Sequence, residues 1–77
     1  MIENFAATRK EVGHRIKARR VAVHKTQKDL GAEIGVEQTQ VCEWEIGRRA
    51  LKVEQILAIA KALETTVGYL VGEQRAA

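Results

Sequence analysis

The chain has little of what catalysis, metal binding or covalent cross-linking requires. Cys42 is its only cysteine, so an internal disulfide is excluded. The two histidines, His14 and His24, are separated along the chain and form no metal-ligand spacing with that cysteine. No phosphate-binding glycine loop and no nucleophile in a recognisable motif is present. The sequence therefore predicts that the protein is not an enzyme and uses no metal ion or cofactor.

Proline is absent, aromatic residues make up 4% of the chain, and no apolar run is long enough to cross a bilayer. The N-terminus also lacks the apolar core of a signal peptide. The apolar residues are mostly Ala, Val, Leu and Ile, which suit a small helical bundle, and 77 residues provide for one core. We expect a cytoplasmic, all-α domain with no membrane partner.

Basic residues are missing from the middle of the chain. Residues 1–28 contain eight basic and two acidic side chains, whereas residues 29–47 contain five acidic side chains and no basic one. Basic residues outnumber acidic ones again from Arg48 onward, and the formal net charge is +3. This layout fits a middle segment that recognises bases between cations that bind phosphates, although the acidic side chains themselves oppose contact with a polyanion.

Cap-type residues mark where the first helices begin. Thr8 with Glu11 has the spacing of a capping box and predicts a helix that runs to about Ala22, and Thr26 with Asp29 has the same spacing. His24 stands where the first helix ends, and a left-handed conformation is expected there at some strain.

The second helix is expected to end at Gly35, which can turn the chain sharply because it lacks a β-carbon. A third helix resumes at about Gln38. Its inner face should contain Val41, Trp44 and the stem of Glu45. Its free face should contain Gln38, Thr39, Cys42, Glu43 and Ile46. Amide and hydroxyl groups on a free face can hydrogen-bond to base edges.

The second half of the chain supplies the remaining helices. A fourth helix after the loop at residues 48–52 carries a wide apolar arc, which we expect to be core. The members of that arc are Val53, Ile56, Leu57, Ile59, Ala60 and Leu63. Thr66 is a plausible cap for a short fifth helix from Val67 to Val71.

This ordered series resembles the Cro/C1-type helix-turn-helix family, the DNA-binding domains of phage repressors and of many small bacterial regulators. The resemblance covers roughly Val12 to Gly72. It rests on Arg20, Thr26-Gln27, Leu30, Ile34-Gly35-Val36, Val41, Trp44-Glu45, Gly47-Arg48-Arg49 and the run from Ile59 to Leu63. It implies a compact five-helix domain like that of lambda repressor over residues 9–72, with an N-terminal arm or short extra helix at residues 1–8 and a tail at residues 73–77. Gly31 replaces the usual alanine, and Glu64 replaces the usual glycine.

The resemblance implies a sequence-specific DNA-binding transcriptional regulator, a homodimer on a palindromic operator, whose recognition helix from about Gln38 to Ile46 enters the major groove. Glutamine can contact adenine with two hydrogen bonds, and a glutamate can accept one from cytosine. The candidate base contacts are Gln38, Thr39, Cys42 and Glu43. The candidate phosphate contacts are Gln27, Gln40, Lys17, Arg19, Arg48, Arg49 and Lys52. For each, ordinary solvated surface is the alternative interpretation.

Two further sets of residues are expected, an ion pair that the resemblance implies and an apolar surface that the short fifth helix cannot easily bury. Arg20 and Glu45 are expected to form a structural ion pair, because a buried carboxylate needs a partner. Leu51, Tyr69, Leu70 and Val71 are expected at the dimer interface, with capping of the fourth helix as the alternative. RNA polymerase or a toxin remains an open further partner. The alternative function is a protein-interaction adaptor or antitoxin-type module with the same fold and weak or no affinity for DNA.

Overall fold

The computed structural model describes residues 8–72, which form five α-helices and no strand. They are α1 (Arg9–Ala22), α2 (Gln27–Ile34), α3 (Gln38–Glu45), α4 (Val53–Ala62) and α5 (Val67–Leu70). The predicted all-α, five-helix fold is confirmed. Apart from Thr8, the predicted arm and tail lie outside the described residues. Over residues 8–72, no helix is both long and apolar enough to cross a membrane.

The first two helices begin at reciprocal caps, as predicted. The Glu11 amide donates to Thr8 Oγ1 at 3.1 Å, and the Thr8 amide donates to Glu11 Oε1 at 2.9 Å. Thr26 and Asp29 form the same pair of bonds at the start of α2. Each capping box satisfies amide donors that the first helical turn leaves free. These local interactions fix where α1 and α2 start.

A left-handed residue follows each of the five helices, and at α3 and α5 it is Gly47 and Gly72. Gly35, with φ of 80°, follows α2, and its amide donates to the carbonyl of Gly31 at 2.8 Å. His24 after α1 has φ of 62°, as expected, and Glu64 after α4 has φ of 57°. Non-glycine residues pay a steric cost in this region, so two of these turns are held at the expense of backbone strain.

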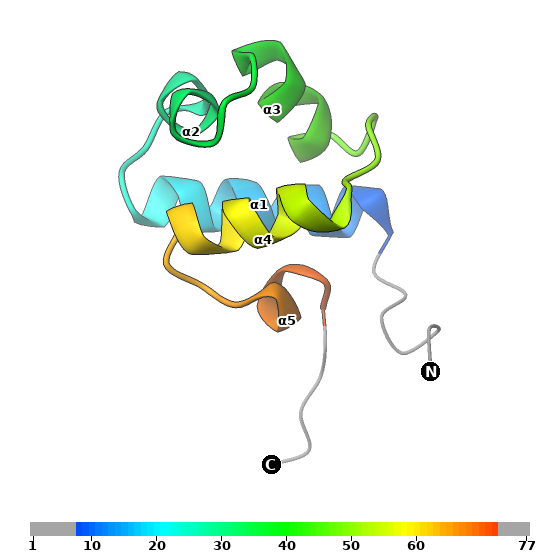
Figure 1. The fold of residues 1–77 in the computed structure, drawn as a ribbon. Coiled ribbons are helices and arrows are strands. Elements are labelled where there is room, and N and C mark those ends of the chain that lie inside the picture. The colour runs from blue at the N-terminus through cyan, green and yellow to red at the C-terminus, as the bar shows by residue number, and fades with distance from the viewer. Residues whose placement is uncertain (1–7, 73–77) are drawn as a thin grey trace.

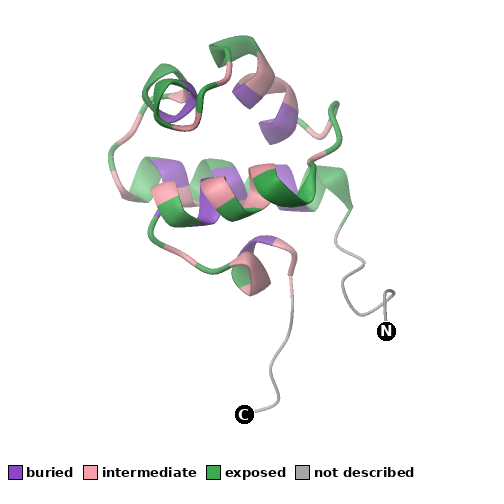
Figure 2. Ribbon diagram, in the orientation of Figure 1, coloured by how far each residue is buried: buried purple, intermediate pink, exposed green. Residues whose placement is uncertain are grey.

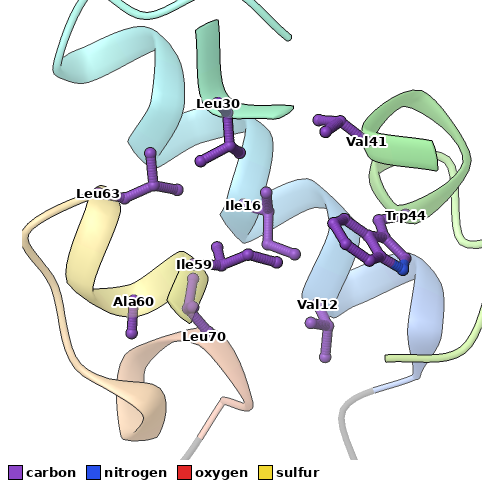
Figure 3. Close-up of a cluster of buried hydrophobic side chains, with 9 residues drawn as sticks. All are labelled: Val12, Ile16, Leu30, Val41, Trp44, Ile59, Ala60, Leu63 and Leu70. Atoms are coloured by element: carbon purple, nitrogen blue, oxygen red, sulfur yellow. The ribbon is translucent and has the colours of Figure 1, made fainter. Parts of the chain in front are cut away.

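The helices surround one apolar core. Figure 1 shows α2 and α3 on one side of α1 and α4, which overlap in this view, with α5 on the other side. α3 packs against α1 and α2, α4 packs against α2 and α5, and α5 also contacts α1. Side chains from all five helices meet in the interior (Figure 3), and these are Val12, Ile16, Leu30, Val41, Trp44, Ile59, Ala60, Leu63 and Leu70.

Two glycines allow helices and turns to approach closely around α3. A β-carbon on Gly13 of α1 would lie 2.2 Å from the carbonyl oxygen of Trp44. A β-carbon on Gly31 would lie 2.6 Å from the carbonyl oxygen of Val36, in the turn before α3. Close approach of the backbone explains Gly31, and the nearest neighbour is the turn before α3 and not α3 itself. The orientation of α3 therefore depends on backbone contacts that any side chain would disrupt.

Two predictions about apolar residues are corrected by the fold. Leu70 is fully buried, with 0% of its surface exposed, so it belongs to the protomer's own core and cannot form a dimer interface. Val53 and Leu57 were expected in the core, but they are 73% and 55% exposed. The inner side of α4 is filled by Ile59, Ala60 and neighbours, and the apolar arc is wider than the surface available to cover it.

Candidate nucleic-acid interface

The two faces of α3 are separated as the sequence predicts. Val41 and Trp44 anchor the helix, with 0% and 1% of their surface exposed. Gln38 and Thr39 at the start of α3 are exposed, as the coloured ribbon in Figure 2 shows for this end of the helix. Ile46 is also exposed, whereas Cys42 and Glu43 are half-buried. The amide-bearing end of α3 is thus held in solvent by a rigid inner face.

A buried ionic network ties α3 to α1 and α2. Arg20 of α1 donates from Nε to Glu45 Oε2 at 2.6 Å and from Nη2 to Glu45 Oε1 at 3.1 Å. Its Nη1 donates to the carbonyl of Lys25 at 2.7 Å. Gln27 of α2 completes the network by donating from Nε2 to Glu45 Oε1 at 2.9 Å. The expected Arg20–Glu45 pair is present, and it extends to a third helix.

The acidic character of residues 29–47 is largely offset by partners outside that segment. Asp29 caps Thr26, whose backbone and side-chain hydrogen bonds lower the pKa of Asp29 below its ordinary value of 3.8. The remaining pairs are Glu33 with Lys25 at 2.9 Å, Glu43 with Arg49 at 2.6 Å and Glu45 with Arg20 at 2.6 Å. Within residues 8–72, Glu37 is the one carboxylate of this segment with no such partner. Each pair reduces the local field that would repel a polyanion.

The side chains of the candidate phosphate contacts differ in their exposure to solvent and in whether they are already bonded within the protein. Lys17, Arg48 and Lys52 are exposed, and Gln40 is half-buried. Arg49 is exposed but bonded to Glu43, and Gln27 Nε2 already donates one hydrogen bond to Glu45.

Arg19 has a different role in the described structure. Its Nε donates to the carbonyl of Leu63 at 2.8 Å, and its Nη2 donates to the carbonyl of Glu64 at 3.0 Å. A guanidinium at this place satisfies carbonyls that the end of α4 leaves free and interacts favourably with the helix dipole. Arg19 therefore stabilises the end of α4.

Two exposed lysines near the candidate interface were not selected from the sequence. Lys28 follows Gln27 in the first turn of α2. Lys10 of α1 lies beside the turn after α3, since a β-carbon on Gly47 would be 2.8 Å from the Lys10 Cα. The position of Lys28 in a capped first turn was a usable signal. No pattern in the sequence indicated Lys10, because its neighbour Gly47 is remote along the chain.

Comparison with known proteins identifies the family. The profile of the helix-turn-helix family matches residues 16–70, more than half of the chain. The chain belongs to this family. The predicted membership of the helix-turn-helix family is confirmed, and the relatives named below are a transcriptional regulator and a repressor, not enzymes.

Two curated proteins resemble this helix-turn-helix chain in sequence. An uncharacterized transcriptional regulator in the ATPase CF(0) region of Rhodospirillum rubrum is 36% identical over 58 residues, which are 75% of the chain and 54% of that protein. Repressor protein C2 of Salmonella phage P22 is 36% identical over 59 residues, which are 77% of the chain and 27% of the repressor. The chain thus spans about half of the first relative and about a quarter of the second.

Two solved structures share the helix-turn-helix fold. The P22 c2 repressor in complex with synthetic operator 9T superposes with a TM-score of 0.77 at 33% identity, covering 82% of this chain and 96% of that chain. The restriction-modification controller protein C.AhdI from Aeromonas hydrophila also gives a TM-score of 0.77, at 27% identity, covering 80% of this chain and 94% of that chain.

Proposed function

We propose that this chain is a sequence-specific DNA-binding transcriptional regulator. The observation that carries the proposal is the exposed start of α3, where Gln38 and Thr39 project from a helix fixed by Val41 and Trp44. The major groove admits an α-helix, and a glutamine amide can form two hydrogen bonds with adenine there. The P22 repressor, which has this fold, is solved with operator DNA.

Base recognition by α3 needs phosphate contacts to orient it. The first turn of α2 leaves the amides of Gln27 and Lys28 without an acceptor in the described part of the chain, and a helix N-terminus attracts anions. Arg48 and Lys52 in the loop after α3, with Lys17 on α1, supply exposed cations. The remaining contacts proposed are Thr39, Cys42 and Glu43 toward bases and Gln40 toward a phosphate, whereas the Arg49 side chain is bonded to Glu43.

We further propose that the regulator acts as a homodimer on a palindromic operator. A single recognition helix contacts only a few base pairs, and two helices related by a two-fold axis contact two half-sites. Exposed apolar side chains on α4 and α5 offer the surface for this pairing. They are Val53, Leu57 and Tyr69, and half-buried Leu51 and Val71, which line one common pocket, are the other candidates.

The adaptor alternative rested on the acidic segment at residues 29–47. Most of its carboxylates are paired with Lys25, Arg49 and Arg20 or with a capped backbone. The acidic composition therefore does not translate into a free anionic surface that would repel DNA, and this favours the regulator.

A salt series on selected DNA tests the proposed function. A duplex enriched from a random library by the purified protein should bind on the order of 10³-fold more tightly than a scrambled duplex. Its affinity should fall steeply and log-linearly with salt concentration, because each neutralised phosphate releases counterions. Absence of binding even at low salt would refute the regulator and support the adaptor.

A further inference from the structure

A surface ion pair links the recognition helix to the loop that follows it. Arg49 donates from Nε to Glu43 Oε1 at 2.7 Å, and its Nη2 lies 2.6 Å from the same oxygen. The side chains of Arg49 and Glu43 are 48% and 29% exposed. Two of the three guanidinium nitrogens of Arg49 therefore lie against one carboxylate oxygen, and Glu43 Oε2 accepts no hydrogen bond from the described residues.

The backbone holds the two side chains together. The Arg48 amide donates to the carbonyl of Glu43 at 2.8 Å, which closes the turn at Gly47. On the other side of Arg49, the Ala50 carbonyl accepts a hydrogen bond from Trp44 Nε1 at 3.3 Å. Arg49 thus lies between two residues that are each bonded to α3, so the fold itself places its guanidinium beside Glu43.

We propose that Arg49 is a positioning residue for base recognition by Glu43. With Oε1 held by Arg49, Oε2 is left to accept a hydrogen bond from the amino group of a cytosine, the donor that this base presents in the major groove. The guanidinium also offsets the charge of the carboxylate, which phosphates would otherwise repel. The inference rests on the proposed function and adds to it a preferred base and the residue that orients its contact.

The chemistry separates this role from a simple phosphate contact. A lysine at position 49 keeps the positive charge and can still bind a phosphate. It lacks the planar fork that directs two N–H groups at one carboxylate. Arg49→Lys therefore removes the positioning of Glu43 while retaining the charge, and Arg48→Lys is the matched control in the adjacent position.

The test is selection of duplexes from a random library, followed by affinity measurements on single-base-pair variants of the selected site. The wild-type protein should prefer a cytosine at one position in each half-site. Glu43→Gln and Arg49→Lys should each reduce the preference at that same base pair by roughly tenfold. The double variant should lose no more than Glu43→Gln alone, because the two residues act as one unit. Arg48→Lys should keep the preference.

Two results would overturn the inference while leaving the proposed function intact. One is a wild-type base preference that survives in Arg49→Lys, and the other is a uniform loss of affinity for all duplexes in that variant. A wild-type protein that selects no sequence would instead contradict the proposed function itself. In the DNA-free protein, Glu43→Gln should shift the NMR resonance of the Arg49 Nε–H group, and an unchanged resonance would refute the ion pair.

Discussion

Single residues in unfavourable backbone conformations mark the ends of two helices. His24 and Glu64 both have positive φ, in a region where a side chain costs about 1–2 kcal/mol. At Glu64 the turn is retained because the Thr65 amide donates to the carbonyl of Ala60 at 2.9 Å and Arg19 binds the carbonyl of Glu64. The hydrogen bonds of the turn therefore stabilise the left-handed conformation of Glu64, and the Glu64 side chain makes no contribution to it.

Glu64→Gly should therefore stabilise the protein. Relief of the left-handed strain exceeds the entropy that glycine adds to the unfolded chain, and the expected net gain is about 0.5–1 kcal/mol in the free energy of unfolding. Urea denaturation measures it. The matched control is Gly35→Ala, where φ is 80° and no atom lies within 4 Å of an added β-carbon. That variant should lose about 1 kcal/mol from backbone strain alone. A neutral or destabilising Glu64→Gly would show that its turn is not strained.

Asp29 gives the capping box of α2 a pH dependence. Hydrogen bonds from Thr26 lower the pKa of Asp29 in the folded protein below 3.8, so the unfolded chain binds its proton first as the pH falls. The stabilisation is complete above the unfolded pKa and is lost as the pH falls through the lowered, folded value. Asp29→Asn should be less stable than wild type near neutral pH, and the difference should shrink below about pH 4. Urea denaturation over a pH series would contradict this if the difference were constant.

At the scale of helices, the Arg20–Glu45 pair holds α3 against α1. Both residues are nearly buried, at 9% and 7% exposure, and Gln27 connects the pair to α2. Removal of one partner leaves a buried charge without compensation, which costs more than the pair itself contributes.

Arg20→Met should lower the free energy of unfolding by about 3 kcal/mol, because Glu45 loses its partner in the interior. The double variant Arg20→Met/Glu45→Leu should recover most of the loss, since two apolar side chains leave no buried charge. Both are measured by chemical denaturation. A double variant as unstable as Arg20→Met would show that packing by the arginine stem, and not the uncompensated charge, determines the loss.

The helix boundaries could be predicted from the sequence because their determinants are local. Thr8 with Glu11 and Thr26 with Asp29 are three residues apart, and Gly35 acts on its own turn. The exposure of Gln38 and Thr39 followed from helical periodicity around Val41. The helix boundaries and the exposed face of α3 could be predicted because they depend on residues within about one helical turn of each other.

Long-range contacts could not be predicted in the same way. Arg19 binds carbonyls 44 and 45 residues away, and no periodic pattern indicates this. Val53, Leu57 and Leu70 were misassigned because hydrophobicity shows that a side chain favours burial and not what covers it. The pairing of Glu43 with Arg49 depends on the conformation of the turn at Gly47, which could not be predicted from the sequence.

At the scale of the whole molecule, exposed apolar side chains gather on the helices at the end of the chain. Leu57 and Val53 lie one turn apart on α4, and Tyr69 on α5 is 44% exposed. Exposed apolar side chains that form one patch commonly mark an association site. The proposed dimer would cover it and leave α3 free.

Leu57→Glu should weaken the dimer by more than about tenfold, because it places a charge in an apolar interface. Analytical ultracentrifugation over a concentration series measures the dissociation constant. The matched control is Val21→Glu on α1, since Val21 is equally exposed at 55% and lies outside the proposed surface. A dimer weakened by Val21→Glu and not by Leu57→Glu would place the interface elsewhere.

The arrangement of charges over the molecule supports the exposed end of α3 as the part that recognises bases. Cations from α1 and from the loops after α1 and α3 pair with carboxylates of residues 29–47, and Arg48, Lys52 and Lys17 remain exposed. Exposed cations contribute affinity for any sequence, whereas side chains at base edges contribute preference.

The most direct test compares wild type, Gln38→Ala and Lys52→Gln on the selected duplex and its single-base-pair variants. Gln38→Ala should lose roughly tenfold discrimination at one base pair and keep the salt dependence. Lys52→Gln should weaken all duplexes alike and reduce the salt slope by about one. If Gln38→Ala instead discriminates among the duplexes as wild type does, the exposed end of α3 does not recognise bases.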